Sequence, residues 1–503
     1  MQVEKDNTIK QLLIMGNGFD LLCGLDTRYR DYFNYRFGIT LKQKLNPEEC
    51  AENQFKIKLR RILFDYLKDR VIPPKPTARL YKNIGDVYSS SLSIKRQKLD
   101  VVKITQEFLE KYFGRLENEI NKIEVIGIQK GYIFKLNAIK SIPFCKWDAV
   151  FLLTSCFLME DSLVQWNDVE TIIFKVVSTV LTDSKKGYFK DCKFDKNINA
   201  EYYFREGIKN CFLEKNKKSD ELAIDILNQL QLFESNFAKY VKANIKKKNN
   251  KYYDNVCKVL IHLMSRITNK QSKIDFDILN FNYSLSIAQF IDDCIPIFKK
   301  YLDLKQETLG LKSWSNIHGI AFYDDKDIVK KLKSKFMMKS SIRNLPAPIF
   351  GIDNHDILTT DQDGNFNFDD PRSIFTKSFR LMDNHVNSIR NNTFQDKVNV
   401  ITFIGHSLNQ ADYSYFEAIF DQYDIFHSNV KLEFYYFTGD FTLNESEAKR
   451  KARSKREERK TMKNIVKLLT SYGSTLKNEH GENIVNKLML EQRLSVIPNP
   501  KVK

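Results

Sequence analysis

Short apolar runs that stop at glycine, asparagine or aspartate recur along the chain, and they predict the strands of a sheet. The first run covers residues 9–15 (IKQLLIM) and ends at a Gly-Asn-Gly turn. Comparable runs come only much later, at residues 274–281, 314–317, 347–352, 398–404 and 430–437. Because strands buried on both faces read as continuous apolar runs, we expect a parallel sheet.

The residues between the first run and the later ones have a helical pattern instead. Apolar residues recur at helical spacing in 55–71, 101–123 and 168–181. The clearest helix runs from 220 to 245, with Ser219 as a candidate N-cap. The lysine-rich KKKNNK that follows predicts the end of this helix and an exposed loop.

These patterns predict an α/β fold with a Rossmann-like parallel sheet that is assembled from both ends of the chain. We assign residues 1–35 and 270–440 to the sheet domain, residues 36–269 to a large helical insertion, and residues 441–503 to a basic helical tail. In an open parallel sheet ligands bind beyond the carboxyl ends of the strands. The insertion leaves the sheet at that edge, so we expect it to wall the site.

Composition narrows the class of protein. The 503 residues are 42% hydrophobic and 28% charged, which excludes a disordered or collagen-like chain. The eight cysteines show no CxxC spacing, so neither a zinc module nor a disulfide framework is predicted. The longest apolar run, 149–159, is too short to span a bilayer, and the N-terminus lacks a signal-peptide pattern. We therefore expect a cytoplasmic protein without a membrane partner.

The net charge of +17 is concentrated toward the C-terminus. The densest piece, KRKARSKREERK at 449–460, is typical either of a nucleic-acid contact or of a solvated helix. Glu457 and Glu458 interrupt it and no stacking aromatics are interleaved, so the solvated helix is favoured. A nucleic-acid partner at 449–460 stays open.

Polar residues follow the predicted strands at the edge where ligands would bind. After the first strand, GNGFD offers Gly16 and Gly18 for close approach to a phosphate, and Asp20 for a helix cap or a ribose hydroxyl. A later strand is followed by Gly405-His406-Ser407, with Asp412 in the next helix. Packing turns and strand-end caps have the same residue types, so each motif alone is weak evidence.

Two further strand ends carry candidate catalytic groups. Asn282 follows the strand DILNF, and its amide has the groups to bind a ribose or a water. His318 follows a short strand in NIHG, and histidine titrates near neutrality, as a general base must. Ser407 as a nucleophile is disfavoured because the G-x-S-x-G elbow is absent. No compact carboxylate cluster appears, so no metal site is predicted.

At this point the residues resemble a known family. LLIMGNGFDLLCGLDTRYRDYF (12–33) is similar to the opening signature of the AbiH family of bacteriophage abortive-infection proteins. The similarity continues through the following motifs: WNDVE (166–170), QLFESNFAKYV (231–241), LNFNYS (279–284), NIHG (316–319), IFGID (349–353), FTKSF (375–379) and FIGHSLNQADYSYF (403–416). The resemblance implies an anti-phage effector.

AbiH-like proteins in turn resemble sirtuin-like domains, whose strand-end motifs surround NAD. The resemblance implies that Asn282 and His318 are catalytic, at the nicotinamide ribose. It implies that the other strand-end residues bind the dinucleotide, and these are Gly16, Asn17, Gly18, Asp20, Gly405, His406, Ser407 and Asp412. GNGFD departs from the sirtuin Gly-Ala-Gly-x-Ser, and Ser284 stands where an aspartate is common.

The resemblance leads to a function. Without a zinc module a protein deacylase is not expected, and NAD hydrolysis to nicotinamide and ADP-ribose remains, with NAD as substrate. The alternatives are a nucleotide-binding sensor without catalysis and a nucleic-acid-binding or nuclease effector. A phage-derived trigger or partner protein and an oligomer fit the resemblance, which identifies neither.

Overall fold

A computed structural model of the chain describes the following residues: 8–29, 31–32, 35, 145–147, 150–151, 167–181, 208–209, 211–212, 217–266, 273–301, 309–335, 346–352, 357, 370–384, 394–439, 446–476 and 481–502. The described chain divides into two compact units. Unit 1 comprises Met1–Thr27, Phe237–Asn354 and Thr376–Lys503, and unit 2 comprises Arg28–Asn236 and His355–Phe375. The sheet lies in unit 1.

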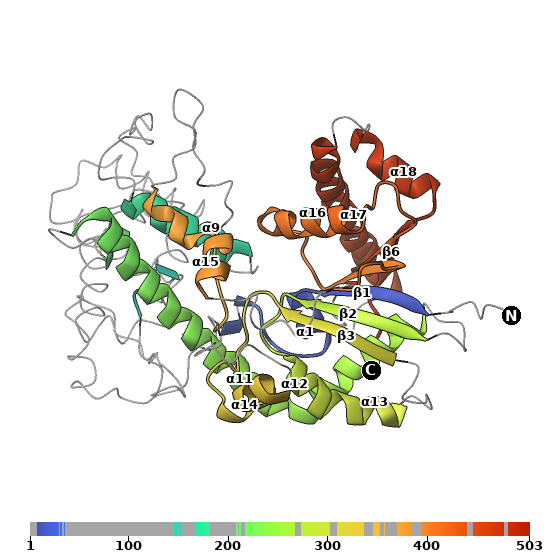
Figure 1. Cartoon of the computed structure of the whole chain (residues 1–503), viewed down its shortest axis with the longest axis horizontal. Coiled ribbons are helices and arrows are strands. Elements are labelled where there is room, and N and C mark those ends of the chain that lie inside the picture. The colour runs from blue at the N-terminus through green and yellow to red at the C-terminus, as the bar shows by residue number, and fades with distance from the viewer. Residues whose placement is uncertain are drawn as a thin grey trace, which may run out of the picture. The chain divides into compact units, whose positions relative to one another are not determined.

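Among the described residues, six parallel strands form one sheet in the order β3-β2-β1-β4-β5-β6 (Figure 1). Their bounds are β1 Ile9–Met15, β2 Ile274–Asn280, β3 Leu309–Asn316, β4 Val400–Ile404, β5 Lys431–Tyr436 and β6 Leu494–Pro498. This is the strand order of a doubly wound nucleotide-binding fold, whose order reverses between β1 and β4. The predicted α/β parallel sheet is confirmed.

Helices cover both faces of the sheet. Figure 1 shows α16 and α17 on one face and α12 and α13 on the other. Unit 1 contains the second part of α11 (Ser219–Ser265) and these further helices: α1 Asn17–Leu22, α12 Ile287–Gln289, η1 Phe290–Cys294, α13 Ile295–Tyr301, α14 Lys326–Lys335, α15 Lys377–Asp383, η6 Gln410–Asp412, α16 Tyr413–Gln422, α17 Glu447–Thr475, η8 Gly481–Asn483 and α18 Ile484–Leu490.

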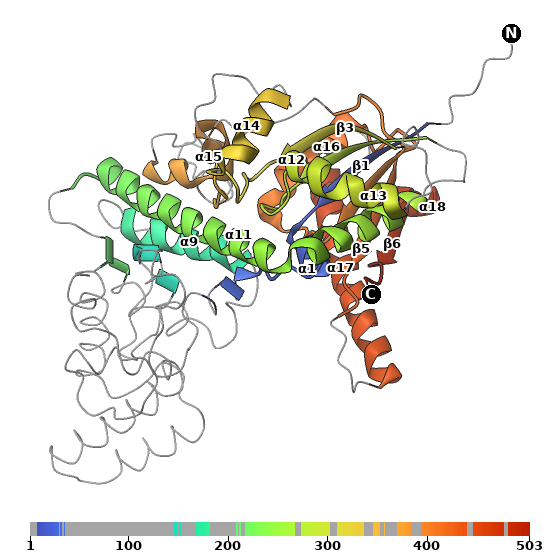
Figure 2. The same cartoon turned by 90° about the horizontal axis from the view of Figure 1, so that it is seen from below.

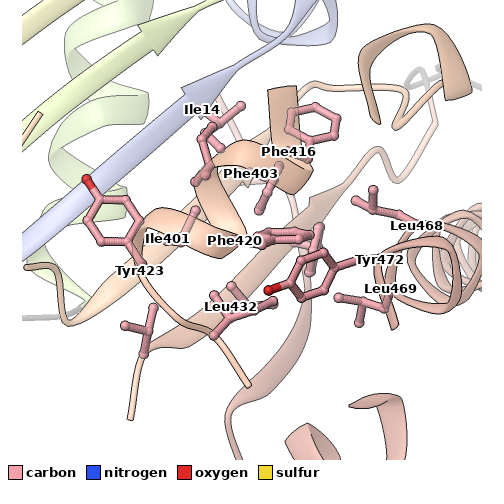
Figure 3. Close-up of a cluster of buried hydrophobic side chains, with 14 of the residues drawn as sticks. Ile14, Ile401, Phe403, Phe416, Phe420, Tyr423, Leu432, Leu468, Leu469 and Tyr472 are labelled. Carbon is pink, nitrogen blue, oxygen red and sulfur yellow. The ribbon is translucent and has the colours of Figure 1, made fainter. Parts of the chain in front are cut away.

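The core of unit 1 lies between the sheet and the α16–α17 layer. Figure 3 shows aromatic and branched side chains from β1, β4, β5, α16 and α17 in one cluster. The ring of Phe403 on β4 stacks on Phe434 of β5, with centroids 4.5 Å apart. The ring of Phe420 on α16 meets Tyr472 of α17 at 5.3 Å. Apolar burial of this kind fixes the sheet and the ends of its strands.

Unit 2 contains α9 (Asn167–Leu181), the first part of α11 (Ser219–Ser265) and the 3₁₀ helix η4 (Pro371–Phe375). Its described core is aromatic, and the ring of Phe151 stacks on Phe233 with centroids 4.9 Å apart. The predicted helix at 168–181 is confirmed as α9. The predicted helices at 55–71 and 101–123 lie outside the described residues.

The structure corrects the predicted end of the long helix. KKKNNK does not end it, because α11 continues without a break to Ser265. The residues beyond the lysines return to apolar side chains that are fully buried, among them Tyr252, Val256 and Leu260. Packing of that later stripe keeps the chain helical across its polar stretch.

The segment at 347–352 is not a strand of the sheet, contrary to the prediction. Its one isolated bridge joins Ile352 to Thr376. Its backbone is bound elsewhere, since the Ile349 N–H donates to the carbonyl oxygen of His318 at 2.9 Å. Arg380, which is buried, donates from Nη1 to the Phe350 carbonyl oxygen at 2.7 Å. The segment therefore lies at the end of β3, where it covers the loop after that strand.

The C-terminal region contributes to the sheet. Residues 441–503 were expected as a helical tail, and they contain α17 and α18 but also β6, which pairs in parallel with β5. Ile465, Leu468 and Leu469 of α17 belong to the buried core. The C-terminal region is therefore part of unit 1.

Candidate functional site

The loops after β1, β2, β3 and β4 meet at one edge of the sheet, because these strands are neighbours and end level with one another. Met15 pairs with both Asn280 and Ile404, and Asn280 pairs with Asn316. The next residue of each strand therefore begins a loop at the carboxyl edge. The predicted site residues come from these loops.

The glycines of the first and fourth loops pack against each other. The Gly16 N–H donates to the Ile404 carbonyl oxygen at 2.9 Å, and the Gly18 N–H donates to the Gly405 carbonyl oxygen at 2.7 Å. A Cβ on Gly16 would lie 2.5 Å from the His406 Cα, and one on Gly18 2.7 Å from the Gly405 oxygen. Both N–H groups are thus used within the protein, so a phosphate at this loop would need other donors.

Asn17 and Gly405 also have structural contacts. The Thr27 hydroxyl donates to Asn17 Oδ1 at 2.6 Å, and this hydrogen bond joins the start of α1 to the residues that follow the helix. Gly405 has a φ of +65°, and a Cβ there would lie 2.0 Å from the Phe19 nitrogen. Only glycine fits such a backbone without strain. The predicted contacts of Gly16, Asn17, Gly18 and Gly405 with a dinucleotide stay predictions.

Asp20 lies inside the protein and does not cap its helix. The Tyr252 hydroxyl donates to Asp20 Oδ1 at 2.7 Å, and the Ser284 hydroxyl donates to Oδ2 at 2.6 Å. Burial raises the pKa of Asp20 to about 6, although both hydrogen bonds lower it. Asp20 therefore joins the first loop, α11 and the loop after β2.

Asn282 is held at the end of β2 by two other asparagines. Asn280 Oδ1 accepts from the Asn282 N–H at 2.9 Å, and Asn316 Nδ2 donates to the Asn282 carbonyl oxygen at 3.2 Å. The side chain of Asn282 is buried, yet neither its Oδ1 nor its Nδ2 has a hydrogen-bond partner among the described residues. A buried amide without partners costs free energy, so Asn282 is a candidate for a ligand contact.

His318 has a similar unpartnered group at the end of β3. Its side chain is buried, and Nε2 has no hydrogen-bond partner in the part of the chain that the structure describes. Burial lowers the pKa of His318 to about 3, with a further lowering from the Lys377 ammonium and an opposing effect of Asp412. At neutral pH the ring is uncharged. The Phe281 ring lies edge-on to it, with centroids 5.2 Å apart.

The fourth loop supplies His406 and Asp412, and Asp412 also pairs with a lysine from α15. The Leu408 N–H donates to His406 Nδ1 at 3.0 Å, so in the neutral ring the proton is on Nε2, 3.5 Å from Asp412 Oδ2. Lys377 Nζ donates to Asp412 Oδ1 at 2.7 Å.

These contacts set the charges of the fourth loop. Burial is the largest single effect on the pKa of Asp412 and raises it, but Lys377, His406 and His318 together outweigh burial and hold that pKa below its usual range. Burial lowers the pKa of His406 to about 4.

The electrostatic effects show which groups are close. His318 responds to Lys377, Asp412 and His406, and the Phe281 ring lies 5.2 Å from one histidine and 4.6 Å from the other. The structure thus brings His318, His406 and Asp412 together. Ser407 stays on the exposed surface, where its carbonyl oxygen accepts from Asn464 Nδ2 at 3.1 Å.

Sequence reasoning missed Lys377, Tyr252 and Ser284. Lys377 lies within the family-like motif FTKSF but follows no predicted strand, and only the tertiary structure shows that it is buried against Asp412. Tyr252 follows the polar stretch of α11 that was expected as a loop. Ser284 lies two residues after Asn282 in the same motif, where the sequence shows it only as a departure from the sirtuin pattern.

Within the described part of the chain no group of three or more histidine, cysteine, aspartate or glutamate side chains has the arrangement of a metal site. None of the described helices is long and apolar enough to cross a membrane. The side chain of Asp168 in the WNDVE motif lies outside the described residues.

A family model described as "Bacteriophage abortive infection AbiH" matches residues 12–436. The match begins within β1 and ends with β5, so it includes the loops that carry Asn282, His318 and Asp412. No curated protein and no solved structure matches the chain significantly.

Proposed function

Since this chain belongs to the AbiH family of bacteriophage abortive-infection proteins, we propose that it is an anti-phage effector that binds NAD at the carboxyl edge of its sheet and cleaves it. Membership of the family indicates a role in phage abortive infection. The main support for the site comes from two buried side chains, since Asn282 Oδ1 and Nδ2 and His318 Nε2 find no hydrogen-bond partner among the described residues. The strand-end motifs resemble those of sirtuin-like domains, and this resemblance suggests NAD as the ligand.

The two side chains suit a ribose. An amide offers an acceptor and two donors, and a neutral imidazole offers one of each, so together they match vicinal hydroxyl groups. Asn282 Oδ1, Asn282 Nδ2 and His318 Nε2 are each shielded from solvent. A sugar that replaces their missing partners would therefore gain hydrogen bonds that water does not supply in the free protein.

The proposed reaction is hydrolysis of the bond between nicotinamide and ribose. Water adds at C1′ of the ribose, the C1′–N bond breaks, and its electron pair goes to the pyridinium nitrogen, which leaves as neutral nicotinamide. The proton from water passes to His318 or to solvent. Such glycosidic cleavages pass through an oxocarbenium-like state. Because the leaving group is cationic before cleavage, no general acid is needed.

The low pKa of His318 bears on its role. The ring stays neutral down to about pH 3, so it accepts hydrogen bonds and protons throughout the physiological range. A base of such low pKa is weak, so we expect its contribution at the lower end of the usual range, about a hundredfold. The same property favours a second candidate function, a sensor that binds the nucleotide through His318 without cleaving it.

The test is nicotinamide release by the purified protein, together with phage protection in cells. Asn282→Ala and His318→Ala should each lower the release rate at least about a hundredfold. The matched controls are His427→Ala and Asn429→Ala, both exposed in the loop before β5 at the opposite edge of the sheet. These controls should retain full activity, and circular dichroism should show all four variants folded.

The pH profile gives a second readout. Because the pKa of the His318 ring in the free protein is about 3, kcat/KM should not fall through protonation of this group between pH 8 and pH 5. Wild type could release no nicotinamide with phage components present while both site variants lose protection and nucleotide affinity. That result would favour the sensor function over the hydrolase function. Full protection and unchanged nucleotide affinity in both variants would show that Asn282 and His318 do not form the functional site.

A further inference from the structure

The helix α17 has two halves with different surroundings. The side chains of Ile465, Leu468, Leu469 and Tyr472 in its C-terminal half are buried against the sheet. Among the earlier residues of the helix no side chain is buried. Figure 2 shows this N-terminal half extending away from the sheet. A 29-residue helix therefore presents more than half of its length to solvent.

The orientation of this half is set by contacts on one side. Asn464 Nδ2 donates to the Ser407 carbonyl oxygen at 3.1 Å, and the Ser454 and Tyr436 hydroxyls lie 3.5 Å apart. The Arg453 side chain lies over Gly439, where a Cβ would come within 2.1 Å of its Nε. These residues define the inner side of α17, so the opposite side is its outer face.

The outer face is basic along its whole length. Its exposed charged residues are Lys449, Lys451, Lys455, Arg456, Arg459, Lys460, Lys463 and Lys467. The acidic residues that interrupt the run in sequence do not interrupt this face, because Glu457 and Glu458 are half-buried on the inner side. Arg456 pairs with Glu457 at 3.3 Å, but 77% of the arginine side chain is exposed against 24% for Glu457. Apart from the Arg456–Glu457 pair, the fold thus leaves the basic side chains of this face more exposed than the two glutamates.

We propose that this outer face of α17 binds the phosphate backbone of a duplex nucleic acid, independently of base sequence. From Lys449 to Lys467 the helix is about 27 Å long at 1.5 Å per residue. Duplex DNA carries about one phosphate charge per 1.7 Å of its axis, so a face of this length lies opposite many phosphates. Lysine and arginine side chains bind such phosphates by releasing counterions.

An anionic membrane surface is the competing polyanion, and the face fits it less well. An interfacial helix buries a broad apolar face opposite its basic one. Here the exposed large apolar side chains of α17 are Met462, 41% exposed, and Val466, 47% exposed. The wider apolar stripe of the helix is already packed in the protein core. The chemistry of the outer face is therefore that of phosphate recognition.

The test is fluorescence anisotropy with a labelled duplex of about 20 base pairs, at several salt concentrations. The α17 variant combines Lys451→Gln, Lys455→Gln, Arg459→Gln and Lys463→Gln. The control variant combines Lys246→Gln, Lys247→Gln, Lys251→Gln and Lys326→Gln, which removes the same charge from exposed positions on α11 and α14. Circular dichroism verifies that both variants fold.

The wild type should bind unrelated duplexes equally, with affinity that falls steeply as salt rises. The α17 variant should bind at least tenfold more weakly at 50 mM salt. Its log–log salt slope should be shallower by about three to four, since each lost phosphate contact removes about one. The control variant should stay within threefold of wild type. Equal weakening in both variants, no duplex binding by wild type at 50 mM salt, or binding to phosphatidylserine vesicles in place of duplex would each overturn the proposal.

Discussion

Asp20 keeps its carboxyl group in the protein interior, and this has a consequence for stability. Its folded pKa of about 6 lies above the ordinary aspartate value of 3.8, so the folded state holds the proton more tightly than the unfolded state. The stability that the folded protein gains from this bound proton is fully present below about pH 4 and is lost as pH rises through about 6. A shift of this size corresponds to about 3 kcal/mol at most.

Asp20→Asn should remove that loss, because the amide is never charged and retains an acceptor and a donor for the two hydroxyl groups. The free energy of unfolding of the variant, relative to wild type, should therefore increase by about 2–3 kcal/mol from pH 4.5 to pH 7.5. Urea unfolding at the two pH values measures this difference, with Asp421→Asn at an exposed position of α16 as the matched control. A difference that does not grow with pH would contradict the assignment.

The close contact of the two glycine loops allows a second test at the residue scale. Gly405→Ala places a Cβ 2.0 Å from the Phe19 nitrogen at a φ of +65°, and the expected loss of stability is about 2–4 kcal/mol. Gly24 is the matched control, since its φ is +87° but the nearest atom to a Cβ is 3.7 Å away. Gly24→Ala should cost only about 1 kcal/mol in a urea titration.

The residue types at the site were predictable, while their roles were not. Asn282 and His318 were found because polar residues after buried strands collect at one edge of a sheet. That their side chains lack partners depends on contacts that no local pattern shows. Gly16 and Gly18 illustrate the converse, because a loop that packs on another loop reads in sequence like one that binds phosphate.

At the scale of elements, the strength of the apolar pattern decided which strands were predictable. β1, β2, β4 and β5 are apolar runs between turn residues, and each was expected near its observed bounds. The first half of β3 (LGLK) is partly exposed, and β6 (LSVIP) is a short edge strand with a proline at its end, so neither has that pattern. The run at 347–352 has the pattern but covers a strand end instead.

The packing of α17 predicts how strongly the C-terminal region supports the sheet. Leu468 is fully buried, so Leu468→Ala should lower the free energy of unfolding by about 2–5 kcal/mol. Val466 is 47% exposed on the same helix, and Val466→Ala should change it by less than about 0.5 kcal/mol. Equal small effects in a denaturant titration would mean that the C-terminal region is an independent tail.

At the scale of the whole molecule, the expected assembly of one sheet from both ends of the chain is confirmed. β1 comes from the N-terminus, yet its neighbours β2 and β4 come from residues beyond 270 and 400. The boundaries between the units were less predictable. They follow Thr27, Asn236, Asn354 and Phe375, and the second of them falls inside the continuous helix α11, where no break in the pattern signals it.

The position of β1 has a consequence for how the protein is made. Ile9 pairs with Ile274, so the first strand leaves the ribosome long before either neighbour exists. At about 5–20 residues per second, roughly 13–53 s pass before β2 is synthesised. During that interval an apolar strand with two unpaired edges is exposed to other nascent chains. We therefore expect chaperones to bind the segment that contains β1 during synthesis. The supply of these chaperones should then limit the yield of active protein in the cell.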